Sequence, residues 1–112
     1  MKLTLLISSI VLIVGDAVAI CPGFNFGIGN VVPLSQGFNR WNVFDDSCNA
    51  VDGLTTNGNP CTQGIFACSP APILFDGYTN SFTGLRYACR TDPRSGTCNG
   101  QVISVCCRND GN

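Results

Sequence analysis

Residues 89–107 read Cys89-Arg-Thr-Asp-Pro-Arg-Ser-Gly-Thr-Cys98-Asn-Gly-Gln-Val-Ile-Ser-Val-Cys106-Cys107, and they hold four of the eight cysteines in the chain of 112 residues. The stretch ends in the doublet Cys106-Cys107. In an extended strand neighbouring side chains point to opposite faces, so the two thiols of the doublet can tie the strand to two different parts of the chain. A bond between Cys106 and Cys107 themselves is excluded, because it would close a strained eight-membered ring.

The run Gln101 to Cys107 is rich in β-branched residues and alternates Val102 and Ser104 against Ile103 and Val105, which is typical of a strand.

An earlier run, Ser81 to Cys89, also alternates, with a slip at Gly84 that indicates a β-bulge. We therefore predict an antiparallel hairpin between these two runs, joined by a long loop over residues 90–100 that is tied by disulfides.

Residues 1–19 have the pattern of a secretory signal peptide. Lys2 forms a basic start, Leu3 to Val14 is an apolar run too short to cross a bilayer, and Ala17-Val18-Ala19 is a cleavage site. We expect a mature chain of residues 20–112 that forms a single secreted, extracellular domain without a transmembrane segment.

The cysteines of the mature part are even in number, and the chain is short. A small core is marginal by itself, so these features predict four disulfides as the main source of stability. Eight cysteines allow on the order of 100 pairings, and the sequence does not choose among them. The disulfide residues are Cys21, Cys48, Cys61, Cys68, Cys89, Cys98, Cys106 and Cys107.

Charged residues are few, with a formal net charge of −1 and no histidine. No basic stripe exists to neutralise phosphates, so we expect no nucleic acid partner. A zinc site is disfavoured because no C-x-x-C motif and no histidine occur, and we predict no metal and no cofactor.

The remaining chain predicts short strands and no long helix. Cys21 to Gly29 places Phe24, Phe26 and Ile28 on one side of an extended segment, with glycines that allow close backbone approach on the other. Phe38 to Phe44 is interpreted as irregular or strand.

Dipeptides typical of turns occur in the middle of the chain. Cys48 to Cys61 is predicted as a loop because it contains Asp52-Gly53 and Asn57-Gly58. A short strand is expected within Thr62 to Cys68, and another at residues 73–75, closed by Asp76-Gly77. The fold class is a small, mostly β, disulfide-rich secreted domain with little or no helix.

General acid–base catalysis lacks its usual residues, since the chain has no histidine, no glutamate and no spare thiol. A carboxylate pair of Asp45 or Asp46 with Asp76 could in principle hydrolyse a glycoside. Their turn-like surroundings favour a structural role, and we predict that the protein is not an enzyme.

Asp45, Ser47, Asn49 and Asp52 offer oxygen ligands for calcium, but the glycine and glutamate of an EF-hand loop are missing. We therefore predict no calcium site.

Aromatic residues supply a different kind of candidate site. Most of them are expected in the core, but Trp41 and Tyr78 sit among polar residues. We predict these two as ligand-binding residues that stack on a cell-wall polysaccharide.

The segments Ala-Cys89-Arg-Thr-Asp-Pro-Arg-Ser-Gly-Thr-Cys98 and Val-Ile-Ser-Val-Cys106-Cys107-Arg-Asn-Asp resemble uncharacterised small secreted cysteine-rich proteins of mushroom-forming fungi. That resemblance implies an extracellular protein and brings no established activity.

Residues 98–107 and Cys68-Ser-Pro are also locally similar to hydrophobins, which carry eight cysteines. Hydrophobins, however, have two cysteine doublets with further cysteines after each, and they need large exposed apolar patches.

The leading functional hypothesis is a secreted, non-catalytic interaction protein at a cell wall or host surface, including an effector-like role, with a wall polysaccharide or an extracellular protein as partner. The alternatives are a hydrophobin-like surface-active wall protein and, third, a toxin or antimicrobial, which the slightly acidic charge disfavours.

Overall fold

The computed structural model describes residues 20–70 and 74–109 of the chain. The predicted signal peptide at residues 1–19, the start of the apolar strand predicted at residues 73–75, and the C-terminal residues 110–112 lie outside this range. The described part is a small, mostly β domain with four disulfides, as predicted. Its helical content is two three-residue 3-10 turns, η1 (Ser35–Gly37) and η2 (Pro60–Thr62).

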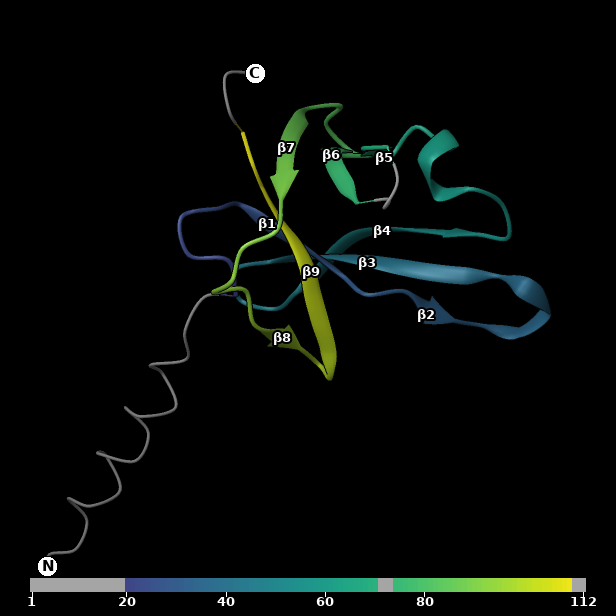
Figure 1. Cartoon of the computed structure of the whole chain (residues 1–112), viewed down its shortest axis with the longest axis horizontal. Helices are drawn as coiled ribbons and strands as arrows, with labels where there is room; N and C mark the ends of the chain where they lie inside the picture. The colour runs from purple at the N-terminus through teal and green to yellow at the C-terminus, as the bar shows by residue number, and fades with distance from the viewer. Residues whose placement is uncertain (1–19, 71–73, 110–112) are drawn as a thin grey trace, which may run out of the picture.

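Within the described residues, nine strands form an antiparallel arrangement around the C-terminal strand β9 (Figure 1). The main sheet has the order β2-β3-β1-β9-β7-β6-β5, with β4 beside β3 and β8 beside β9. The strands are β1 (Phe26–Gly29), β2 (Val32–Pro33), β3 (Asn39–Asp45), β4 (Ala50–Thr56), β5 (Phe66–Cys68), β6 (Phe75–Thr79), β7 (Arg86–Arg90), β8 (Thr97–Cys98) and β9 (Gln101–Arg108).

Strand β9 is the longest strand and binds three neighbours, β1, β7 and β8. Its doublet behaves as predicted from strand geometry, because Cys106 bonds to Cys21 and Cys107 bonds to Cys89. The two bonds belong to different apolar clusters, one on each face of the strand. The exclusion of a Cys106–Cys107 bond is confirmed.

Two buried clusters form the core. The first lies between β1, β3 and β9 on one side and β5 and β6 on the other, and contains Ile28, Val43, Phe66, Tyr78, Cys89, Val105 and Cys107. The second covers the opposite face and contains Ile20, Cys21, Phe44, Cys98, Ile103 and Cys106. Each cluster includes half-cystines, so covalent bonds and apolar burial support one another in a domain with a small core.

The expected alternation along β9 is broken at Ser104. Ile28 of β1 is opposite Val105, while the next residue, Gly29, is opposite Ile103, so Ser104 is an extra residue in the ladder. This bulge moves Ile103 and Val105 into different clusters, whereas strict alternation would place both on one face. The predicted strand is confirmed, but the predicted placement of Ile103 and Val105 on the same face is wrong.

The close backbone approach predicted for the glycines near the N-terminus is confirmed at Gly27. A methyl group added there would meet Ile103 Cγ2 at 2.8 Å, Ile20 Cδ1 at 2.9 Å and Cys21 Sγ at 3.0 Å. Phe24 lies before β1 and packs against the second cluster, so it does not share the face of Phe26.

The prediction of a loop over Cys48 to Cys61 is wrong, because residues 50–56 form β4. Asp52-Gly53, expected to be a turn, lies inside this strand, opposite Val43 and Asn42 of β3. Gly53 is needed for packing rather than for turning, since a Cβ there would overlap the guanidinium of Arg40.

Asp76-Gly77 was likewise expected to close a strand but lies within β6, where Gly77 pairs with Ala67 and Ala88. Gly84 is not a bulge in a strand, because it ends the turn before β7 with a positive φ of 77°. The predicted antiparallel pairing of this region with the C-terminal strand is confirmed by Cys89, which lies opposite Cys107.

Candidate functional site

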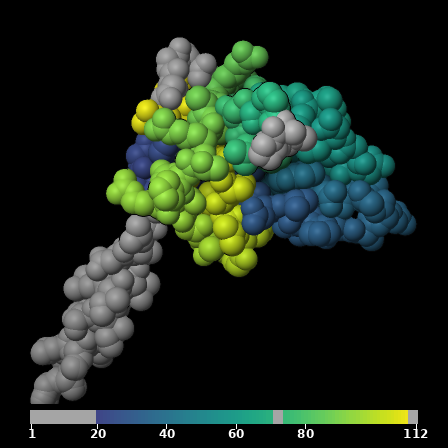
Figure 2. All heavy atoms as spheres, in the orientation of Figure 1, coloured from purple at the N-terminus to yellow at the C-terminus, as the bar shows by residue number. Residues whose placement is uncertain are grey.

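A groove with a volume of about 470 Å³ lies where β3, β6 and β9 approach one another. Figure 2 shows the blue residues that follow β1 beside the yellow residues of β9 on the visible face. The groove is lined by Asn30, Val31, Trp41, Leu74, Phe75, Ser104 and Val105. Because these residues come from four distant parts of the sequence, the groove is a product of the sheet topology.

Trp41 forms the aromatic wall of this groove together with Phe75. Strand β3 directs Trp41 and Val43 to the same face, and Val43 anchors that face in the first cluster. The Trp41 and Phe75 rings meet edge to face, with centroids 6.1 Å apart. Phe75 in turn stacks on Phe66 at 4.5 Å. The aromatic wall is therefore held by the core while part of each ring remains accessible.

The rim of the groove is apolar and exposed. Val31 and Leu74 have exposed fractions of 44% and 45%. Val105, at the base of the groove, is buried. Such a combination of accessible apolar rim and fixed base is what a ligand with an apolar face requires.

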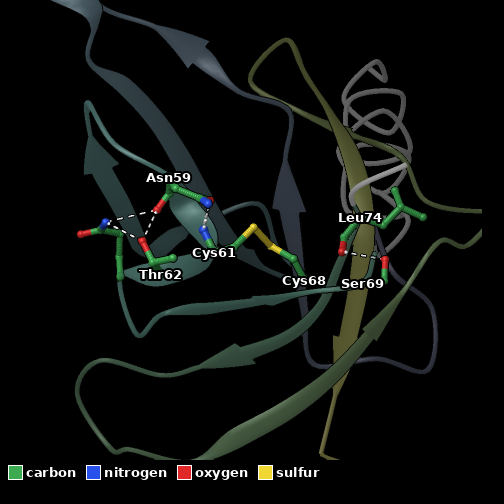
Figure 3. The surroundings of a disulfide bond; sticks show 7 residues. Asn59, Cys61, Thr62, Cys68, Ser69 and Leu74 are labelled. Carbon is green, nitrogen blue, oxygen red and sulfur yellow. Dashed lines mark hydrogen bonds between the residues drawn. A yellow bond between two sulfur atoms is a disulfide. The ribbon is translucent and has the colours of Figure 1, made fainter. Parts of the chain in front are cut away.

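Leu74 is positioned by a disulfide and a pair of hydrogen bonds (Figure 3). The Leu74 carbonyl accepts the Ser69 backbone N–H at 2.9 Å and the Ser69 hydroxyl at 3.3 Å. The neighbouring residue, Cys68, is bonded to Cys61 of η2. Asn59 caps η2 by accepting the Cys61 N–H at 2.8 Å. The rim is thus tied through Cys68 to a capped turn.

The described residues that line the groove include no charged side chain. Its polar groups include the amide of Asn30 and the hydroxyl of Ser104, which donates to the Ile28 carbonyl at 3.0 Å. Chemically, this surface can hold an uncharged ligand by ring contact and a few hydrogen bonds, and it offers no group for proton transfer.

Tyr78, the second predicted ligand-binding residue, lies away from the groove lining. It is 2% exposed and belongs to the first cluster. Its hydroxyl donates to Asp52 Oδ2 at 2.6 Å and accepts from Asn80 Nδ2 at 3.1 Å. Burial, together with the hydrogen bond to Asp52, raises the pKa of Tyr78 well above its usual range. The structure therefore separates the two predicted residues, because Trp41 lines this groove while Tyr78 lies at a different depression, on β5, β6 and β7.

Asp52 is the hub of a polar network that sequence reasoning missed. Its carboxylate accepts from the Tyr78 hydroxyl and from both the backbone N–H and the hydroxyl of Ser81, at 2.9 Å and 2.7 Å. Burial raises the pKa of Asp52, but these hydrogen bonds and that of the Gly53 N–H outweigh it, so the pKa is lowered overall.

The other acidic candidates have local partners. Asp45 Oδ1 accepts the backbone N–H groups of Ser47 and Asn49, each at 2.9 Å. The Asn49 N–H is the main cause of the lowered pKa of Asp45. Burial, and then the negative charge of Asp45, raise the pKa of Asp46. The residues weighed for calcium thus form a capped turn around Asp45, while Asp52 points to other partners.

Asp76 lies in a second, smaller depression of about 310 Å³ on β5, β6 and β7. A row of small residues, Ala67, Gly77 and Ala88, pairs across these strands and leaves this depression open. Within residues 20–70 and 74–109, no group of three or more His, Cys, Asp or Glu side chains is arranged to hold a metal ion.

Of the groove residues, only Trp41 was predicted as a site residue. Phe75 was assigned to a short strand, and Ser104 was placed in a regular alternation. No local pattern distinguishes these residues from core positions, because their common site depends on strands that are distant in sequence.

The fold and groove define a small, disulfide-stabilised β domain with an uncharged aromatic groove. Comparison with protein-family models, curated proteins and solved structures gives no match to this chain. In the part of the chain that the structure describes, no helix is long and apolar enough to cross a membrane.

Proposed function

We propose that the chain is a secreted, non-catalytic interaction protein that acts at a cell wall or host surface, with the Trp41 groove as its contact site for wall polysaccharide. The observation that carries this proposal is the pairing of Trp41 and Phe75 beside the amide of Asn30 in a groove without charges. Neutral sugar rings present an apolar face, which matches the aromatic pair, and hydroxyl groups, which match the amide.

Two further features support an extracellular role. Every cysteine of the described residues is in a disulfide, which is typical of an oxidising compartment. Ile20, the residue expected to follow the cleavage site, is 4% exposed, and its carbonyl accepts the Gly96 N–H at 3.0 Å. The folded domain therefore includes the first residue of the expected mature chain.

The test is retention of the disulfide-bonded protein on insoluble chitin, β-glucan and cellulose. We expect retention on at least one polymer, and we expect Trp41→Ala to weaken it roughly tenfold or more, as is usual for a tryptophan at the centre of a contact. Phe38→Ala is the matched control, because Phe38 is 38% exposed and lies outside the groove lining. Equal loss in both variants, or no retention of the wild type, would contradict the proposal.

A further inference from the structure

The turn between β6 and β7 presents an aromatic side chain to solvent. Phe82 has an exposed fraction of 79%, the largest of any large apolar side chain in the described residues. Leu85, at the end of the same turn, is 46% exposed. The turn lies at the upper edge of the molecule in Figure 1, between the labels β6 and β7. Burial of a phenyl ring is favourable, so this side chain can contribute to a contact with another apolar surface.

The backbone of this turn is held rigidly by Asn80. The buried Asn80 side chain accepts the N–H groups of Phe82 at 2.8 Å and Thr83 at 3.0 Å. The backbone N–H of Asn80 donates to the Leu85 carbonyl at 2.9 Å, and the backbone carbonyl of Asn80 accepts the Gly84 N–H at 2.8 Å. These bonds close the turn from within and fix the position of Phe82.

The base of the turn is fixed to a neighbouring strand. Ser81 donates both its N–H and its hydroxyl to Asp52 of β4, the carboxylate that also binds the Tyr78 hydroxyl. A rigid turn loses little backbone entropy when its side chain binds, which is how a preorganised contact gains affinity.

The same molecule carries a concave surface of matching character. The Trp41 groove is apolar, is free of charged side chains and holds an aromatic wall suited to edge-to-face contact with another ring. The turn residues from Asn80 to Leu85 are also uncharged. Neither surface therefore opposes the other electrostatically, and the net charge of the chain is only −1.

The turn and the groove of one molecule are held apart. The groove includes Phe75, the first residue of β6, whereas the turn begins after Thr79, the last residue of that strand. At about 3.3 Å per residue the strand alone separates them by roughly 13 Å. Phe82 consequently does not fill the groove of its own chain.

We propose that Phe82 of one molecule inserts into the Trp41 groove of a second copy, so that copies associate head to tail. Such a contact joins two different surfaces and leaves a free turn at one end and a free groove at the other. Association also covers the groove, which makes self-association a regulator of polysaccharide binding. This regulatory consequence rests on the proposed function, while the contact itself does not.

The test is sedimentation analysis of the disulfide-bonded protein over a range from micromolar to millimolar concentration. We expect the average mass to rise with concentration, and Phe82→Ala to weaken association roughly tenfold or more. Trp41→Ala is expected to do the same, and Val31→Asp, which places a charge at the exposed rim, serves as a second groove variant. Leu34→Ala, at a residue 47% exposed and outside both surfaces, should associate as the wild type does.

Mixing two variants gives the decisive result. Phe82→Ala keeps the groove and Trp41→Ala keeps the turn. At a concentration where the wild type associates but each variant alone is monomeric, their mixture should form dimers and nothing larger. A monomeric wild type, undiminished association of Phe82→Ala, or a mixture that stays monomeric would overturn the proposal.

Soluble β-linked oligosaccharides separate this inference from the proposed function. Dissociation of the assembly by the sugar would support both. Association that the sugar leaves unchanged, together with no retention on polymers, would support the contact and contradict polysaccharide binding. A monomeric wild type retained on polymer through Trp41 would overturn the contact alone.

Discussion

At the residue scale, Asp52 shows how a side chain expected in a turn serves a different purpose. Its carboxylate joins β4 to Tyr78 in the core and to Ser81 at the base of the exposed turn. The sequence pattern here is Asp52-Gly53, and such pairs are common in turns. The same pair also suits a strand that needs a carboxylate acceptor next to a residue without a Cβ. Here Gly53 makes room for Arg40.

Asp52→Asn is expected to destabilise the fold at neutral pH by about 1–3 kcal/mol, because hydrogen bonds to a charged acceptor are replaced by weaker ones. The folded-state pKa of Asp52 is lowered, so ionisation stabilises the fold fully above the unfolded-state pKa of about 3.9. That contribution is lost as the pH falls through the folded-state pKa. Urea unfolding at pH 7 and at pH 2–3 should therefore show that the free energies of unfolding of the wild type and of Asp52→Asn differ at pH 7 and become similar in acid.

The matched control for this experiment is Asp76→Asn, since Asp76 is exposed and lies in the outer depression. The free energy of unfolding of Asp76→Asn should remain within about 0.5 kcal/mol of that of the wild type at neutral pH. A constant difference between wild type and Asp52→Asn at every pH would show that the charge of Asp52 is not what stabilises the network.

At the element scale, the Cys61–Cys68 disulfide joins η2 to β5 and stands one residue from the Ser69–Leu74 hydrogen bonds. Its cysteines are seven positions apart, so it closes a short loop. This element supports the groove rim more than it supports the fold, because neither cysteine belongs to a buried cluster.

Replacing both cysteines in Cys61→Ser/Cys68→Ser should reduce the free energy of unfolding by about 2–3 kcal/mol, the loop-entropy value for so short a loop. The fold should persist with its near-ultraviolet circular dichroism unchanged. Retention on polymer should fall because Leu74 loses its fixed position. Unchanged retention would show that the rim is positioned without the disulfide.

Sequence patterns located some elements and missed others. The C-terminal strand, the strand at Phe66–Cys68 and the hairpin partner of Cys107 follow from β-branched runs and alternation. Strand β4 was missed because two Asx-Gly pairs suggested turns, and the bulge at Ser104 was missed because it is created by the register of β1. Register depends on the partner strand, and the pattern of one strand does not contain it.

At the scale of the whole molecule, the Cys21–Cys106 disulfide closes almost the entire described chain. Its cysteines are 85 positions apart, and both are fully buried in the second cluster. Chain-entropy reasoning assigns about 4–5 kcal/mol to a loop of that length. Because small domains are marginally stable, this one bond accounts for much of the stability.

Cys21→Ala/Cys106→Ala is therefore expected to destabilise the protein about twice as strongly as loss of the Cys61–Cys68 bond. The comparison uses the urea midpoint of both double variants at the same pH and temperature. A variant lacking Cys21–Cys106 that unfolds at the same midpoint as one lacking Cys61–Cys68 would contradict the ranking.

The amino-acid sequence by itself determined the β class, the participation of all eight cysteines in disulfides and the separate partners of Cys106 and Cys107. Those properties follow from composition and from the alternation of a strand, which are local. Only the tertiary structure decided the four pairings, the burial of Tyr78 and the accessible position of Trp41 beside Phe75. The reason is that each depends on which distant segments become neighbours, and the strand order and register of the sheet set that proximity.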